Sequence, residues 1–106
     1  MLDGQLRLLG LGQRAGTVTV GTTGVRAALQ RGDLALVVIA GDASDRTKDK
    51  VVRLAQAKGI RCLSGPAAVE LGRVLGRGEV QAVGVRDAQL AAGIIGAVEP
   101  VKARRT

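Results

Sequence analysis

The sequence predicts an α/β protein, a three-layer α/β/α sandwich with a small mixed sheet. Stretches in which apolar residues recur at helical spacing alternate with short apolar stretches typical of strands along the whole chain. Leu34 to Ala40 is apolar at every position, as expected of a central strand covered on both faces. The chain of 106 residues has the size of one domain, so we expect a single domain over residues 1–99 and a basic, disordered tail over residues 100–106.

The first half of the chain begins with a helix and a short strand. Leucine spacing predicts the helix over residues 2–14, and residues 17–20 alternate between polar and apolar side chains as a strand does. A second helix follows, and Thr22 or Thr23 is expected to cap its N-terminus. Gly32 is expected to end it, since glycine readily adopts the left-handed conformation found after helix C-termini.

The second half continues the same alternation after the central strand. Residues 42–44 are expected to cap a third helix that ends at Gly59, and residues 60–63 form the next strand. Residues 64–66 are expected to start a fourth helix, with the proline near its first turn, where a missing N–H is tolerated.

The fourth helix is expected to pack through one apolar face, and Gly72 would permit close approach of another helix. That face comprises Val69, Leu71, Val74 and Leu75. A strand over residues 80–85 and a helix over residues 88–96 complete the pattern.

The residue types that are missing exclude several classes of enzyme. The chain has no histidine and a single cysteine, Cys62. An ordinary structural zinc site and histidine-dependent catalytic triads therefore cannot be built. Only nine acidic side chains are present, and most have basic neighbours, so we expect a non-enzymatic protein without metal or cofactor. Cys62 is expected to be a small apolar residue in a buried strand.

The charge of the chain indicates a polyanionic partner. Sixteen basic residues against nine acidic ones give a net charge of +7, and there is no Phe, Tyr or Trp. Proteins that bind flexible single strands stack the bases on aromatic rings, so folded RNA fits this chain better. Twelve of the basic residues are arginines, which contact phosphate and guanine in a bidentate manner. The alternative explanation for the same excess of arginine is genomic base composition.

No segment of the sequence indicates a membrane or secreted protein. No apolar stretch reaches the length of a transmembrane helix, and the first residues lack the features of a signal peptide. The single cysteine permits no disulfide within the chain. We therefore expect a cytoplasmic protein, and nothing in the sequence requires more than a monomer.

A glycine-containing turn, Gly21-Thr22-Thr23-Gly24, separates a predicted strand from a predicted helix. The unpaired N–H groups at such a helix start favour phosphate. The segment from Gly16 to Thr23 nearly matches the nucleotide-binding pattern GxxxxGK[ST], but Thr22 occupies the position of the lysine that contacts phosphate. Nucleotide hydrolysis is therefore not expected, and the turn is interpreted as part of a polyanion-binding site.

Three segments together resemble the L7Ae/L30e family of ribosomal and kink-turn RNA-binding proteins, most closely its small bacterial ribosome-associated branch. They are LLGLGQRAG (residues 8–16), VGTTGVRAALQRGDLALVVIAGDAS (residues 20–44) and VELGRVLG (residues 69–76). The resemblance implies the α/β/α sandwich that the apolar spacing predicts independently. It also implies binding to a kink-turn, a sharply bent RNA helix with tandem sheared G·A pairs.

The resemblance implies a site at the start of the second helix and in two neighbouring loops. Gly21 matches the glycine at the helix start, Arg31 a basic residue on the same helix, and Asp42 an acidic residue after the central strand. Residues 64–68 match a loop whose apolar side chains cover extruded bases. The candidate RNA-binding residues are Gly21, Thr22, Thr23, Gly24, Arg26, Arg31, Asp42, Ser64, Gly65, Pro66 and Ala67.

The chain departs from the family pattern where the family reads guanines. Thr23 and Gly24 stand where an Asn-Glu pair is common, and Ala27 stands where a lysine is usual. Arg26 is next to the missing lysine, but one residue along a helix turns a side chain by about 100°. Loss of these groups should reduce sequence discrimination, because phosphate contacts position RNA without specifying it.

Each candidate also has a purely structural interpretation. Gly21 would simply permit a strand-to-helix turn, while the two threonines and Asp42 would serve as helix caps. Arg26 and Arg31 would be solvated surface residues.

Two functions follow from the sequence. The first is non-enzymatic binding of structured RNA, with ribosomal RNA and a kink-turn as the expected targets and ribosomal proteins as further partners. The alternative is a protein-interaction module that keeps the fold but has lost the RNA-reading surface. The changes at Thr23, Gly24 and Ala27 are the sequence feature that favours this alternative.

Overall fold

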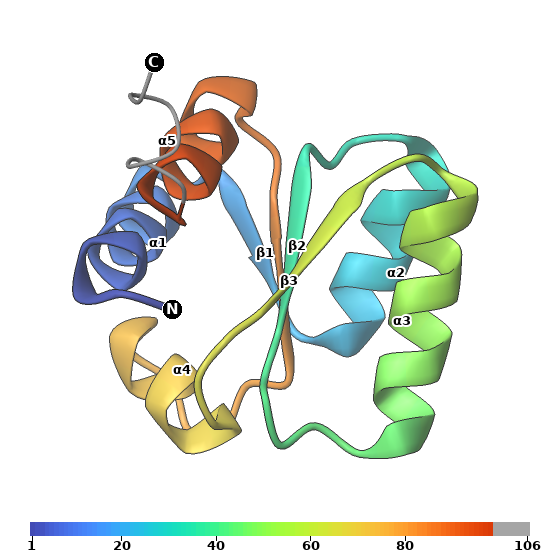
Figure 1. The fold of residues 1–106 in the computed structure, drawn as a ribbon, viewed down its shortest axis with the longest axis horizontal. Coiled ribbons are helices and arrows are strands. Elements are labelled where there is room, and N and C mark those ends of the chain that lie inside the picture. Colours follow the sequence, from blue (N-terminus) through green and yellow to red (C-terminus); the bar gives the residue numbers. More distant parts are fainter. Residues whose placement is uncertain (99–106) are drawn as a thin grey trace.

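The computed structural model describes residues 1–98, in which helices and strands alternate (Figure 1). The elements of this part of the chain are α1 (Asp3–Ala15), β1 (Val18–Val20), α2 (Thr22–Arg31), β2 (Leu36–Ile39), α3 (Asp45–Ala57), β3 (Arg61–Ser64), α4 (Ala68–Val74), β4 (Ala82–Val85) and α5 (Ala88–Val98). The tail predicted for residues 100–106 lies outside the described residues. None of the described helices is long and apolar enough to cross a membrane.

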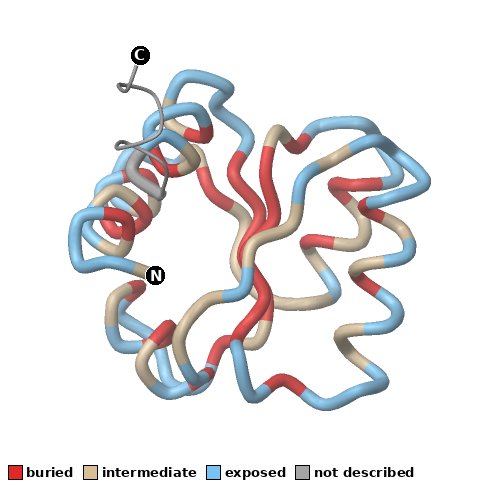
Figure 2. The backbone as a smooth tube through the Cα atoms, viewed as in Figure 1, coloured by how far each residue is buried: buried red, intermediate tan, exposed pale blue. Residues whose placement is uncertain are grey.

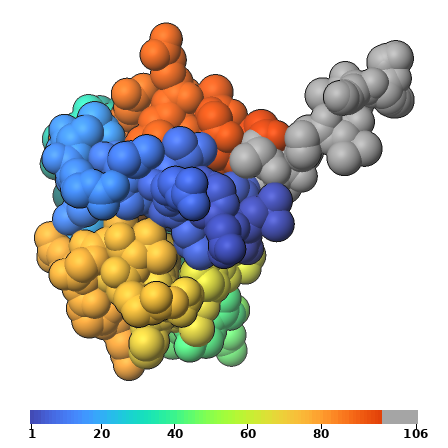
Figure 3. Space-filling view, turned by 90° about the vertical axis from the view of Figure 1, so that its left-hand side faces the viewer, coloured from blue at the N-terminus to red at the C-terminus, as the bar shows by residue number. Residues whose placement is uncertain are grey.

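The four strands form one mixed sheet in the order β1-β4-β2-β3. β4 pairs antiparallel with both β1 and β2, whereas β2 and β3 pair in parallel. Helices α1, α4 and α5 cover one face of the sheet, and α2 and α3 cover the other (Figure 1). Figure 3 views the first of these faces, where α1 lies between α5 and α4. The three-layer α/β/α prediction is confirmed.

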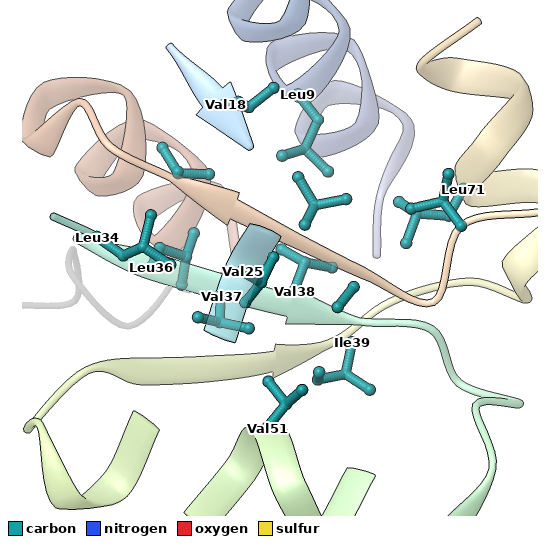
Figure 4. Packing of buried hydrophobic residues seen from close by; sticks show 14 of the residues in the cluster. Leu9, Val18, Val25, Leu34, Leu36, Val37, Val38, Ile39, Val51 and Leu71 are labelled. Carbon is teal, nitrogen blue, oxygen red and sulfur yellow. The ribbon is translucent and has the colours of Figure 1, made fainter. Parts of the chain in front are cut away.

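The core lies on both faces of the central strands β2 and β4. Every residue of these two strands is buried (Figure 2), as expected of strands covered by helices on both sides. Val37 and Ile39 lie toward α2 and α3, close to Val25 and Val51 (Figure 4). Full burial of one such side chain contributes about 1.5–3 kcal/mol, so the β2 and β4 side chains dominate the stability of the sheet.

Gln5 is the one polar side chain buried within the described core, and it connects two helices of the same layer. Its Nε2 donates to the carbonyl of Ile94 in α5 at 3.0 Å, and its Oε1 accepts from the N–H of Leu2 at 2.6 Å. Both ends of the amide are therefore satisfied, which removes the cost of burying it. The contact fixes the start of α1 against α5.

The helix starts differ from the predictions at two places. Gly21, and neither threonine, is the N-cap residue of α2, and no side chain caps that helix. α4 begins at Ala68 rather than at residues 64–66, because Ser64 still belongs to β3, and Pro66 lies just before the first turn of the helix. At α3 the prediction is confirmed, because the Ser44 hydroxyl accepts from the N–H of Thr47 at 3.1 Å.

Three side-chain predictions are corrected by the packing. Val69 is 60% exposed, because the buried face of the short helix α4 is formed by Ala68, Leu71 and Leu75. Cys62 is only half-buried, because β3 is an edge strand of the sheet. Gly72 contacts the loop after its own helix rather than another helix: a Cβ there would lie 1.4 Å from the carbonyl oxygen of Gly78.

The contact between Gly72 and Gly78 yields a stability prediction. Gly72→Ala should lower the free energy of unfolding by about 1–3 kcal/mol or more, because the backbone at Gly78 must move to admit the methyl group. Gly78→Ala is the matched control, since a Cβ at Gly78 would meet no atom within 4 Å. Urea unfolding of both variants checks the prediction, and equal losses would contradict it.

Candidate functional site

Four connections of the chain meet at one end of the sheet, at the bottom of Figure 1. The strand register places Val20 opposite Val83 and Ile39 opposite Ala82, and Ser64 lies beside Ile39. The carboxyl ends of β1, β2 and β3 therefore lie next to the amino end of β4. As a result, the starts of α2 and α3 and the loops before and after α4 are neighbours, although they are far apart in sequence.

Gly21 forms the turn from β1 into α2. Its N–H donates to the carbonyl of Ala82 at 2.8 Å, and its own carbonyl accepts the first bond of α2 from Val25 at 3.0 Å. Its φ of 101° lies in the region that favours glycine. Gly21 therefore permits the strand-to-helix turn, as its structural interpretation predicts. A side chain at this position would strain the turn.

The first turn of α2 presents backbone donors to solvent. In an α-helix the N–H groups of the first turn have no intrahelical acceptor, and here no side chain caps them. These N–H groups belong to Thr22, Thr23 and Gly24. They carry the positive end of the helix dipole, which favours an anion at this place.

A cleft of about 470 Å³ opens at this helix start. It lies between the β1–α2 turn, the first turn of α3 and the loop that joins α4 to β4. Its lining residues are Val20, Gly21, Thr22, Thr47, Arg77, Gly78, Glu79, Val80 and Gln81. The cleft therefore combines the backbone of a helix start with two hydroxyls, an amide, one guanidinium and one carboxylate.

Arg77 supplies the positive side chain of the cleft. It is exposed, and within residues 1–98 its guanidinium forms no ion pair or hydrogen bond. Its backbone N–H donates to the carbonyl of Gly72 at 2.7 Å, which holds the loop against the end of α4. A fixed backbone with a free guanidinium is suited to contact an anion in the cleft.

The sequence does not single out Thr47, Arg77 or Gln81 as site residues. Arg77 lies between two glycines, Gly76 and Gly78, which signals a loop but does not show what the loop faces. Only the pairing of β4 with β1 brings this loop to the start of α2.

Two of the predicted regions lie at the same end of the sheet without lining the cleft. Asp42 accepts a hydrogen bond on Oδ1 from the N–H of Ala68 at 2.8 Å, so it caps α4. The N–H of Gly41 donates to the carbonyl of Pro66 at 2.9 Å. These two bonds join the β2–α3 turn to the loop of residues 64–67 and hold that loop beside the turn. Of the two interpretations of Asp42, the structure supports the helix cap, on a helix 26 residues away.

The predicted arginines of α2 lie away from the cleft. Arg31 is in the last turn of the helix, about 14 Å along its axis from Thr22, and its Nε donates to Asp33 at 2.8 Å. Arg26 lies one turn along α2 and faces a separate groove toward α3. The structure therefore does not bring Arg31 together with the other candidates.

Gly24 has a packing role that explains the lack of a side chain there. A Cβ at this position would lie 2.9 Å from Cγ2 of Thr19 in β1, which is closer than real contacts of this kind. α2 therefore packs tightly on β1 at the point where the resembled family commonly has a glutamate. Thr23 is exposed at the same helix start.

The described residues offer little for metal or nucleophilic chemistry. No group of three or more His, Cys, Asp or Glu within residues 1–98 is placed to hold a metal ion. Burial raises the pKa of the Cys62 thiol above its usual value, which lowers the fraction of reactive thiolate at neutral pH. Cys62 also lies on β3, outside the cleft.

Residues 6–93 match the model of the ribosomal protein L7Ae/L30e/S12e/Gadd45 family. The chain belongs to this family, and the resemblance inferred from the sequence is confirmed. No curated protein matches the chain in sequence.

Two solved structures show the same fold. A protein of unknown function from Bacillus halodurans is 30% identical with a TM-score of 0.85, and the match covers 90% of this chain and 96% of that one. A 15.5kD RNA binding protein from Giardia lamblia is 23% identical with a TM-score of 0.73, over 91% of this chain and 85% of that one. At this lower identity, the second match shows a likeness of fold alone.

The cap on α4 leads to a second stability prediction. Asp42→Ala should lower the free energy of unfolding by about 0.5–2 kcal/mol, because the N–H of Ala68 loses its acceptor. Asp42→Asn keeps an oxygen acceptor at the same place and should remain within a few tenths of a kcal/mol of the native protein. Thermal or urea unfolding distinguishes the two variants. A loss in Asp42→Asn as large as that in Asp42→Ala would show that the charge, rather than the cap, matters.

Proposed function

We propose that this protein binds structured RNA, without catalysis, through the cleft at the start of α2. The observation that carries the proposal is the cleft itself, in which uncapped N–H groups of a helix start lie beside the free guanidinium of Arg77. Membership of a family named for ribosomal proteins supports it, as does the fold shared with an RNA binding protein from Giardia lamblia. The net charge of +7 adds a general attraction to RNA.

The contacts follow from the chemistry of the lining. Thr22 lines the cleft, and Thr23 and Gly24 follow it in the same first turn of α2. The N–H groups of this turn donate to phosphate oxygens, and Arg77 neutralises the phosphate charge. Thr47 and Gln81 offer a hydroxyl and an amide, which suit base edges and the ribose 2′-hydroxyl. Glu79 adds a carboxylate that accepts from base amino groups and repels a second phosphate.

The shape of the RNA, more than its sequence, is the recognised feature. Thr23 and Gly24 offer no amide or carboxylate to guanines, and the close contact of Gly24 with β1 leaves no room for a side chain without a shift. A bent RNA such as a kink-turn within ribosomal RNA fits a helix start flanked by loops. We propose a cytoplasmic monomer that meets ribosomal proteins only as neighbours on such an RNA.

A gel-shift comparison tests the proposal directly. The full chain is titrated into a kink-turn RNA and into a plain duplex of the same length and composition, at low and at moderate salt. We expect tighter binding to the kink-turn RNA and a steep loss of affinity as salt rises. Equal affinity for the two would remove the shape preference. No binding to either RNA at low salt would contradict the proposed function and favour a protein-interaction module.

Replacing Arg77 by alanine tests whether RNA binds in the cleft. Arg77→Ala should weaken RNA binding about tenfold and reduce the slope of log K against log salt by about 1, as expected for one lost phosphate contact. Arg31→Ala is the matched control, because it removes the same charge at the opposite end of α2. Salt titrations of both variants provide the measurement. If both variants bind equally, then the cleft is not the site.

A further inference from the structure

A second groove lies between α2 and α3, on the face of the sheet opposite α1. It has a volume of about 390 Å³ and is lined by Arg26, Gln30, Asp49, Lys50, Arg53 and Leu54. Three of these six residues are cations and one is an anion. The function proposed above makes no use of this groove.

The groove lies about one helical turn beyond the cleft along both helices. On α2, Thr22 lines the cleft and Arg26 lines the groove, four residues later on the same helix face. On α3, Thr47 lines the cleft and Lys50 lines the groove, three residues later. Both helices start at the same end of the sheet (Figure 1), so a chain that leaves the cleft meets Arg26 and Lys50 about one helical turn farther on.

The charges of the groove are only partly neutralised by the protein. Arg53 donates from Nε to Asp49 at 2.9 Å, so the anion of the groove is already paired. Within residues 1–98, neither Arg26 nor Lys50 forms an ion pair. Arg46, exposed one turn before Lys50, adds a further cation to the same side of α3.

Arg26 carries a donor that the described part of the chain leaves unsatisfied. Its Nε is buried and has no hydrogen-bond acceptor among residues 1–98. Buried donors without a partner are rare and unfavourable, because the group has lost water and gained nothing. A ligand at the groove that offers an acceptor to this guanidinium would remove that cost.

We propose that the groove between α2 and α3 binds the phosphate backbone of the RNA arm that leaves the cleft, with Arg26 and Lys50 as the neutralising side chains. This inference rests on the proposed function and extends its footprint from the bend of the RNA to one of its arms. An acidic protein segment is the competing occupant. The short distance between the groove and the cleft, about one helical turn, favours RNA, since one ligand then reaches both.

RNA length provides the test. The full chain and the variant Arg26→Gln/Lys50→Gln are titrated with two kink-turn RNAs, one with arms of about 4 base pairs and one with arms of about 12, a length that exceeds one turn of the duplex. For the long RNA, we expect the variant to bind about 10- to 100-fold more weakly and to show a salt slope smaller by nearly 2. For the short RNA, both proteins should bind within about threefold of each other, because the lost phosphate contacts are absent.

A control separates a local contact from a general loss of charge. Arg7→Gln/Arg14→Gln removes the same two charges from α1, on the other face of the sheet, where both arginines are exposed. This variant should bind both RNAs nearly as the native protein does. Urea unfolding of all three proteins verifies that each binding measurement is made on folded protein.

The outcomes distinguish this inference from the function on which it rests. If the native protein binds neither RNA, then the proposed function fails and the groove fails with it. If the native protein binds both RNAs but the two double variants behave alike, then the groove is not an RNA site and the cleft proposal stands. Weaker binding of the groove variant to the short RNA as well, by the same factor, would also overturn the assignment to an arm.

Discussion

The fold depends on the register of β4 between β1 and β2. Gly84 pairs with Thr19 on one side and Val37 on the other, and the Leu34 side chain occupies the space beside it, 2.5 Å from where a Cβ would lie. A shift of one residue would turn the buried valines of β4 to the opposite face. The same register places Ala82 against Gly21, so the packing that stabilises the sheet also assembles the cleft at its end.

The direction of the chain in the sheet explains the positive character of that end. α2 and α3 follow β1 and β2, whose carboxyl ends lie at the same end of the sheet with the start of β4 between them. Both helices therefore begin at this end, and both dipoles are positive toward the cleft. The α2 start is left uncapped by side chains, while Ser44 caps α3 and Asp42 caps α4. A backbone N–H at the start of α3 and one at the start of α4 are therefore hydrogen-bonded to side chains of the protein. The N–H groups at the start of α2 have no such side-chain acceptor, which favours anion binding at that helix start.

The arginines of the chain have different roles that their identity alone does not reveal. Arg31 pairs with Asp33 at the far end of α2, and Arg53 pairs with Asp49 on the surface of α3; such exposed pairs contribute about 0–1 kcal/mol. Arg77 and Arg26 form no such pair within the described residues and line two separate hollows, the cleft and the groove. On the α2 and α3 side of the sheet, unpaired positive charge is thus available for a ligand in the cleft and, about one helical turn farther on, in the groove.

Apolar spacing and glycine conformation are local properties, so the α/β/α layers, the central strand and the end of α2 at Gly32 could be predicted from the sequence. The sequence also indicated the helix start at Gly21 as an anion site, since the strand, the glycine turn and the helix are adjacent. Tertiary structure alone decided that Asp42 caps α4 and that Arg77 and Thr47 share the cleft. These contacts join segments more than 20 residues apart, and their geometry follows from strand register, which no local pattern encodes.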